Sequence, residues 1–266
     1  MSQPQHVVMF SSGLASYFAA LRVVEHHPDH EVVLLFADVK GNNPSPHAGE
    51  DEDNYRFLRE AADDLATVGN TRVAWLRGDE DIWAVFRRER FIGNTRVAPC
   101  SKELKQKPAR EWLAEHCPDD DATVVHIGLD WTEQHRKAAI RRAYAPRPVM
   151  FPMMAGPYLS KPDMMRAARA RGIEPPRLYD LGMPHANCGG FCVRSGQAQF
   201  ELLLRTMPER YAYHEAREQE LREYLGTDAA ILRDRRGGGT RPLTLRAFRE
   251  RIEAARRGHR ATGRYP

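Results

Sequence analysis

The sequence lacks any apolar run near the roughly 18 residues that a membrane helix needs, and its start, MSQPQHVVMF, lacks the basic residues and long apolar stretch of a signal peptide. Cysteine is scarce as well, because the four that are present are too few for the disulfide framework of a secreted protein. We therefore expect a cytoplasmic protein with no membrane contact, in which cysteine serves catalysis or metal binding.

The composition lacks the bias of a disordered or fibrous chain, since 42% of the 266 residues are hydrophobic and 29% are charged. These values predict a folded enzyme or binding protein with a sizeable core. Positive charge is local: residues 231–266 hold eleven arginines against three acidic residues, a net +8, which leaves −4 for the remainder. Such an end can attract a phosphate backbone, but it also fits a solvated terminus, and both interpretations stay open.

Apolar spacing predicts a helix within this basic end. Leu245, Phe248 and Ile252 recur at helical intervals, which is typical of a short amphipathic helix that docks on the rest of the protein. The glycine triplet at 237–239 precedes it and is interpreted as a hinge. We expect residues 196–266 to form a helical, basic C-terminal region.

Short runs rich in β-branched residues, apolar on both faces, predict buried strands at 7–10, 32–37, 73–76 and 123–129. Segments of helical character lie between them at 17–26, 53–66 and 108–116. This alternation predicts an α/β fold in which helices cover both faces of a parallel sheet. The acidic loop at 41–53 is interpreted as either an active-site lid or a mobile segment.

The first predicted strand runs directly into SSGLAS at 11–16 and then into a helix. In a parallel sheet such a turn lies at the carboxyl edge, where backbone N–H groups and the positive helix end can bind a phosphate. An ordinary helix N-cap is the alternative. The loop is not a Walker A motif, since no Gly-Lys-Ser/Thr follows it.

Four segments in order give this loop a more specific meaning. FSSGLAS at 10–16 resembles the PP-loop of ATP pyrophosphatases, and PCSKELKQKP at 99–108 resembles a segment of their sulfonucleotide reductase branch. GLDWTEQHR at 128–136 and PPRLYDLGMPHANCGGFC at 175–192 are similar to the two later motifs. The resemblance implies a nucleotide-binding domain at 1–195 with a parallel five-stranded sheet of the adenine nucleotide alpha-hydrolase type.

The resemblance also implies ATP and Mg²⁺ as cofactors. The residues that it places at the nucleotide are Ser11, Ser12, Gly13, Ser16, Asp38, Gly128, Asp130, Glu133 and Arg136. Ala15 stands where the family has an aspartate that organises the Mg-bound phosphates, so either Asp38 or Asp130 takes that part or pyrophosphate chemistry is weakened. Glu133 and Arg136 are three residues apart and can also pair with each other.

Three cysteines fall in the segments that resemble the sulfur-handling motifs. The residues implied to be catalytic are Cys100, Cys188, Cys192 and Lys105. Three converging thiolates suit a [4Fe–4S] cluster with one open iron; zinc with His185 as a fourth ligand, a persulfide with a resolving cysteine, and inert buried thiols are the alternatives. We expect Cys117 to be inert.

By resemblance, the function is that of an ATP pyrophosphatase that adenylates a nucleic-acid substrate, DNA or RNA, for sulfur insertion, in DNA phosphorothioation. A sulfur donor such as a cysteine desulfurase and a homodimer belong to this expectation. The alternatives are tRNA thiolation, sulfonucleotide reduction and a non-catalytic nucleotide-binding subunit. The Glu-Cys-Gly-x-His segment of the reductases is absent from the sequence.

Overall fold

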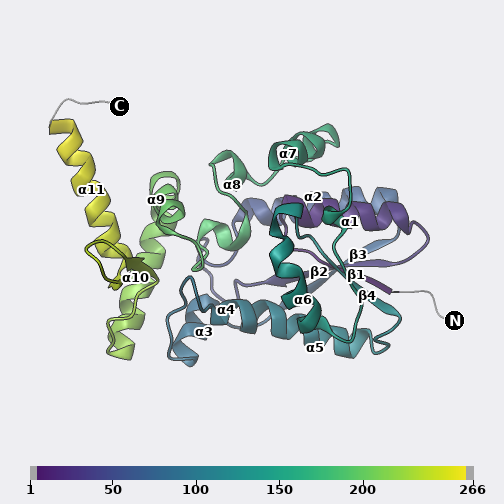
Figure 1. Cartoon of the computed structure of the whole chain (residues 1–266), viewed down its shortest axis with the longest axis horizontal. Helices are drawn as coiled ribbons and strands as arrows, with labels where there is room; N and C mark the ends of the chain where they lie inside the picture. Colours follow the sequence, from purple (N-terminus) through teal and green to yellow (C-terminus); the bar gives the residue numbers. More distant parts are fainter. Residues whose placement is uncertain (1–4, 262–266) are drawn as a thin grey trace.

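A parallel five-stranded sheet forms the centre of the protein, as Figure 1 shows for a computed structural model that describes residues 5–261. The strand order is β3-β2-β1-β4-β5, and every neighbouring pair is parallel. The strands are β1 (Gln5–Met9), β2 (Val32–Asp38), β3 (Thr71–Arg77), β4 (Thr123–Ile127) and β5 (Val149–Met150). The predicted α/β fold with a parallel five-stranded sheet is confirmed.

Helices cover both faces of the sheet, with α1 (Leu14–His26) and α2 (Glu52–Val68) on one side and α5 (Lys107–His116) on the other (Figure 1). Alternation along β1 sorts its side chains between the faces: Val8 packs in the cluster of α1 and α2, and Val7 packs in the cluster of α5. This two-sided burial is why the strands are continuous apolar runs.

The strand β3 departs from the prediction that it is buried on both faces. It lies at the edge of the sheet, and the side chain of Trp75 is 40% exposed. The prediction was wrong here because an apolar run reports local composition, whereas the edge position is set by the strand order.

The remaining helices follow the sheet strands or extend beyond them. They are α3 (Ile82–Arg88), α4 (Pro99–Ser101), a π-helical turn (Lys102–Gln106) that continues into α5, α6 (Lys137–Tyr144), α7 (Lys161–Ala170), α8 (Arg177–Asp180), α9 (Gln197–Thr206), α10 (Pro208–Leu225) and α11 (Leu245–Ala261). Within residues 5–261, no helix combines the length and the apolar character that crossing a membrane requires.

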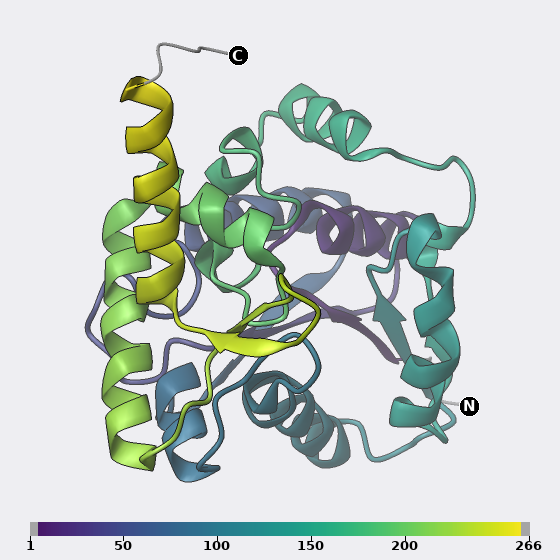
Figure 2. The ribbon, with the colours of Figure 1, turned by 60° about the vertical axis from the view of Figure 1, so that its left-hand side comes forward.

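The C-terminal region is helical, as predicted, and shares the main hydrophobic cluster. Leu245, Phe248 and Ile252 are buried on one side of α11, so the predicted amphipathic helix is confirmed. The glycine triplet is not a hinge: it lies between β6 (Leu232–Asp234) and β7 (Arg241–Leu243), which form an antiparallel hairpin beside α10 and α11 (Figure 2). The division of the chain at residue 195 stays a prediction.

Candidate active site

A cavity of about 760 Å³ opens at the carboxyl edge of the sheet. Residues at or just beyond the ends of three strands line it: Met9 and Ser11 for β1, Val39 for β2, and Ile127 and Gly128 for β4. Ligands of open parallel sheets bind at this edge, and cavities for small molecules span about 300 to 1,000 Å³. The place and the size therefore suit a nucleotide-sized ligand.

The loop between β1 and α1 is held together by one side chain. Ser16 Oγ accepts hydrogen bonds from the N–H groups of Ser11 (3.2 Å) and Gly13 (3.3 Å) and donates one to the Gly13 carbonyl (2.8 Å). Ser11, Gly13 and Ser16 line the cavity. Ser12 does not: it is fully buried, has a φ of 52°, and its hydroxyl donates to the Ser11 carbonyl.

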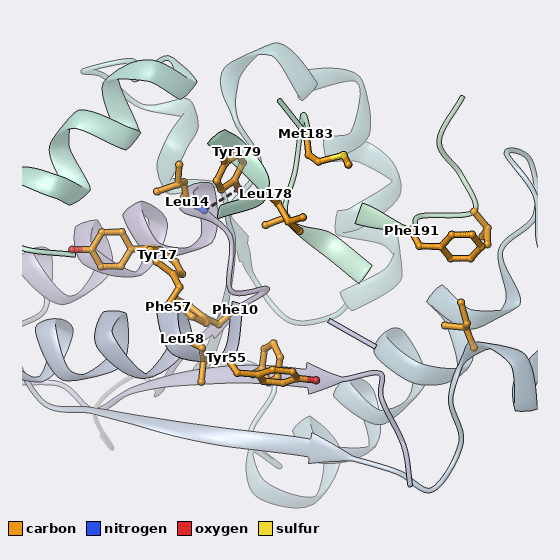
Figure 3. Close-up of a cluster of buried hydrophobic side chains, with 14 of the residues drawn as sticks. Phe10, Leu14, Tyr17, Tyr55, Phe57, Leu58, Leu178, Tyr179, Met183 and Phe191 are labelled. Atoms are coloured by element: carbon orange, nitrogen blue, oxygen red, sulfur yellow. Dashed lines mark hydrogen bonds between the residues drawn. The ribbon is translucent and has the colours of Figure 1, made fainter. Parts of the chain in front are cut away.

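Tyr179 on α8 also lines the cavity and contacts this loop directly. Its hydroxyl accepts a hydrogen bond of 3.3 Å from the N–H of Leu14 (Figure 3). Burial raises the pKa of Tyr179, so the phenol stays neutral. A Cβ on Gly13 would lie 3.2 Å from this hydroxyl, which is tighter than an ordinary contact. The loop therefore has little room for a side chain at position 13.

Gly128 brings the turn after β4 against the same loop. A Cβ at this position would lie 2.7 Å from the Ala15 carbonyl oxygen and from Ser16 Cα, so the close approach requires glycine. The turn then places Asp130 and Glu133 in the cavity wall.

Some charged side chains on this wall already form hydrogen bonds or ion pairs within the protein. Asp130 Oδ1 caps the following turn by accepting from the Thr132 N–H at 2.8 Å, and Glu133 forms an ion pair with Arg136, one of the two pairings that the sequence left open. Lys161 at the start of α7 also lines the cavity, with Nζ 5.0 Å from the centre of the Tyr179 ring. Burial lowers the pKa of Lys161, while Asp130 and Glu133 oppose that shift.

Asp38 lies outside the cavity lining, although it ends β2 as predicted. The Tyr55 hydroxyl donates to its Oδ1 at 2.7 Å, and Arg77 binds its Oδ2 at 3.0 Å. Both carboxylate oxygens are therefore engaged away from the phosphate loop.

The cysteines Cys100, Cys188 and Cys192 line the same cavity. Cys100 lies on α4, and Cys188 lies in a short 3₁₀ turn (Asn187–Gly190), where its φ is 53°. The interaction between the Cys188 and Cys192 side chains shifts the pKa of both thiols, and the charge of Cys192 also raises the pKa of Cys100. Cys117 lies in the hydrophobic cluster of α5 and does not line the cavity, which fits the inert role expected for it.

A buried carboxylate links these thiols to the loop at 41–53. Glu50 is 2% exposed; its Oε1 lies 3.3 Å from Lys105 Nζ, and its Oε2 accepts from the Gly189 N–H at 3.3 Å. Lys105 Nζ lies 3.9 Å from Cys188 Sγ. Sequence reasoning missed Glu50, because nothing in its neighbourhood along the chain marks it as a partner of Lys105. The loop is anchored at this end by these contacts.

The three thiols differ in acidity. The hydrogen bond from Cys188 lowers the pKa of Cys192, and raises the pKa of Cys188 itself. Burial raises the pKa of Cys100 to about 11. Burial opposes the charge on Lys105, but Cys188 and Glu50 outweigh it and raise the lysine pKa. Among the three thiols, Cys192 is therefore the one whose thiolate form is favoured, in a site that also contains Lys105.

The sheet and this cavity define an α/β protein with a cavity at the carboxyl edge of its sheet. No protein-family model matches the chain, and no curated protein matches its sequence. Among solved structures, the chain is similar to a 4-thiouridine synthetase in complex with RNA and bound ATP, with 15% sequence identity and a TM-score of 0.43. The alignment covers 84% of this chain and 53% of the synthetase, so the chain spans about half of that protein.

Proposed function

We propose that this chain is an ATP pyrophosphatase that adenylates a nucleic-acid substrate for sulfur insertion. The observation that carries the proposal is that the loop resembling a PP-loop and all three cysteines of the sulfur-handling segments line one cavity. The loop at 11–16, Cys100, and the pair Cys188 and Cys192 come from three segments of the chain about 80 to 90 residues apart, so a shared cavity was not implied by their positions in the chain.

For the ATP step, Ser11, Gly13 and Ser16 bind the phosphates at the N-terminus of α1, where the helix dipole favours negative charge. Arg136 and Lys161 in the facing wall supply positive charge to the departing pyrophosphate. An oxygen of the substrate attacks the α-phosphate, which gives an adenylated substrate and pyrophosphate.

Mg²⁺ fits the acidic part of this wall. Ala15 supplies no ligand, whereas Asp130 lines the cavity and its Oδ2 has no hydrogen-bond partner within residues 5–261. A carboxylate oxygen of this kind is the hard ligand that Mg²⁺ prefers. Asp130 would hold the ion, which neutralises phosphate charge when bound.

For the sulfur step, the Cys192 thiolate is the nucleophile that accepts sulfur from a donor such as a cysteine desulfurase. The Cys192 thiolate attacks the outer sulfur of the donor's persulfide and the donor thiolate leaves, which gives a persulfide on Cys192. The outer sulfur of that persulfide displaces AMP from the adenylated substrate, and the Cys188 thiolate then attacks Cys192 Sγ, which releases the thiolated substrate. The Cys188–Cys192 disulfide that forms is reduced by an external dithiol before the next turnover. The donor set of Cys100, Cys188 and Cys192 also fits a [4Fe–4S] cluster, which would hold sulfide at its open iron. Within residues 5–261, the cysteines do not form a group as compact as a single zinc ion requires.

The substrate that we assign is DNA, in phosphorothioation, with tRNA as the second nucleic acid to test. Support comes from the basic C-terminal region and from the reductase-like form of the segments at 99–108 and 175–192. Some arginines of that region are engaged inside the protein: Arg249 pairs with Glu215 and Arg251 pairs with Asp234. Exposed arginines of the region that form no ion pair within residues 5–261 include Arg235, Arg256 and Arg257.

The ATP site is tested by calorimetric titration of ATP into the Gly13→Val protein. The added side chain would collide with the Tyr179 hydroxyl and fill the loop, so we expect ATP affinity to fall at least tenfold. Gly78→Val is the matched control, because within residues 5–261 a Cβ at Gly78 meets no atom within 4 Å. Unchanged ATP affinity in a folded Gly13→Val protein would remove the loop from the site.

The reaction class is tested by its products. Pyrophosphate release from ATP that depends on DNA supports the proposal, and dependence on tRNA assigns the other nucleic acid. Sulfite release from an adenylylated sulfate would replace the proposal by sulfonucleotide reduction, and ATP binding without either product would leave a nucleotide-binding subunit. Anaerobic purification with iron and zinc analysis decides how the cysteines are used.

A further inference from the structure

Three histidines, His6, His27 and His30, lie at the amino edge of the sheet, the edge opposite to the cavity, and His126 contacts His6 from a position further along β4. His6 is on β1 and His126 is on β4, and their side chains share the face of the sheet that α1 covers. His27 follows the last residue of α1, and His30 lies in the connection to β2. A helix that follows a parallel strand returns the chain to the amino edge, which is why these residues meet.

The geometry of three of these side chains suits one metal ion. His6, His27 and His30 each offer a nitrogen, and the three nitrogens lie within 4.8 Å of one another. His6 Nε2 and His30 Nδ1 are 3.0 Å apart. Two nitrogen ligands at 2.0–2.1 Å from one tetrahedral zinc ion lie roughly 3.3 Å apart. The distance between His6 Nε2 and His30 Nδ1 therefore needs to increase only slightly for both to bind one ion.

His126 orients the imidazole ring of His6. His6 Nδ1 lies 3.0 Å from His126 Nε2, and a neutral imidazole carries one N–H. When His6 Nδ1–H donates to His126, its Nε2 lone pair faces His30 and is free to bind a metal. An outer hydrogen-bond acceptor of this kind is typical of metal-binding histidines.

The positions of the imidazole rings show which histidines must move before a metal ion can bind. His6 is 3% exposed and is fixed by His126, whereas His27 and His30 are partly exposed. The rings of His6 and His27 are stacked, with centroids 4.1 Å apart and planes 22° apart. Because a metal lies near the plane of each ring that binds it, coordination requires the two exposed rings to turn toward His6.

We propose that His6, His27 and His30 bind one divalent transition-metal ion of the zinc class, with the remaining coordination position open to solvent. Imidazole nitrogen suits Zn²⁺, Cu²⁺ and Ni²⁺, and hard ions such as Mg²⁺ prefer oxygen. The ion would tie β1 to the connection between α1 and β2 and would stabilise the folded chain through binding. The site is independent of the proposed ATP and sulfur chemistry.

The test uses Zn²⁺ as the probe, in a full-length protein whose Cys100, Cys188 and Cys192 are replaced by serine, so that the thiols of the cavity cannot bind the ion. We expect one equivalent of Zn²⁺ by calorimetry. His27→Gln and His30→Gln should each weaken affinity at least tenfold, because each removes one of three ligands. Neither side chain is buried, so these variants should fold. His116→Gln, at an exposed histidine on α5, is the matched control and should leave affinity unchanged.

A second readout is the midpoint of thermal unfolding. Zn²⁺ should raise the midpoint of the cysteine-free protein and of His116→Gln, and should not raise that of a His27→Gln/His30→Gln double variant. Absence of Zn²⁺ binding in the cysteine-free protein, or equal affinity in the two ligand variants and the control, would overturn the proposal. Either result leaves the ATP experiments on Gly13 unaffected, because they probe the opposite edge of the sheet.

Discussion

Replacing Gly189 by alanine tests how the cysteine turn, the 3₁₀ turn Asn187–Gly190 that contains Cys188, packs against the C-terminal region. Gly189 has a φ of 57° and a ψ of 30°, directly after Cys188 with a similar conformation. A Cβ at this position would lie 1.8 Å from Nη1 of Arg210 on α10 and 2.5 Å from its Cζ. Arg210 is only 2% exposed and donates to the carbonyls of Gly49 (3.2 Å) and Pro46 (3.1 Å). The guanidinium must therefore move without a route to solvent.

The cost of Gly189→Ala has two parts. A left-handed conformation costs a residue with a Cβ about 1 to 2 kcal/mol. Displacement of Arg210 adds the loss of at least one hydrogen bond from a charged donor, about 1.5 to 3 kcal/mol. We therefore expect Gly189→Ala to lower the free energy of unfolding by about 2.5 to 5 kcal/mol.

Gly226→Ala is the matched control for the backbone part. Gly226 ends α10 with a φ of 59° and a ψ of 42°, and within residues 5–261 a Cβ there meets no atom within 4 Å. Urea unfolding followed by circular dichroism should show a loss of only about 1 to 2 kcal/mol for the control. Equal losses in the two variants would refute the argument that Arg210 is packed against the cysteine turn.

The fold was predictable from local patterns because parallel strands buried on both faces are apolar throughout, and helices separate them. The SSGLAS turn was equally visible, since glycine and serine there follow a strand and begin a helix. The edge position of β3 was not visible, because the apolar run around Trp75 resembles that of a central strand. Local composition identifies strands, and long-range pairing decides their order.

The candidate site was predictable only where a motif marks it. Ser11, Gly13 and Ser16 belong to one turn, whereas Glu50 and Lys105 are 55 residues apart and meet through packing. Asp38 illustrates the converse case, because a carboxylate at a strand end was expected at the nucleotide. Tyr55 and Arg77 bind its oxygens instead, and nothing in the strand itself announces those partners.

Two further predictions concern the thiols and the basic region. Because its pKa is lowered, Cys192 should react with iodoacetamide near its maximal rate at neutral pH, with the half-maximal rate at a pH below that of an ordinary thiol. Cys188→Ala removes the hydrogen-bond donor, whereas a serine hydroxyl would keep one, and should therefore move that midpoint upward, as peptide mass spectrometry would measure. A midpoint that does not move would contradict the pairing of the two thiols. Deleting the basic region is not a usable test of nucleic-acid binding, since Leu245 and Phe248 belong to the core. A usable variant changes three exposed arginines, Arg235, Arg256 and Arg257, to glutamine. These changes remove positive charge and leave the buried apolar residues of the region in place. The logarithm of DNA affinity should then fall less steeply with the logarithm of salt concentration, by up to about 0.9 for each phosphate that the protein no longer neutralises. The control makes the same charge change at exposed arginines elsewhere, Arg59, Arg110 and Arg142. If both triple variants shift the salt slope equally, the C-terminal arginines act through net charge and the basic region is no contact surface for nucleic acid.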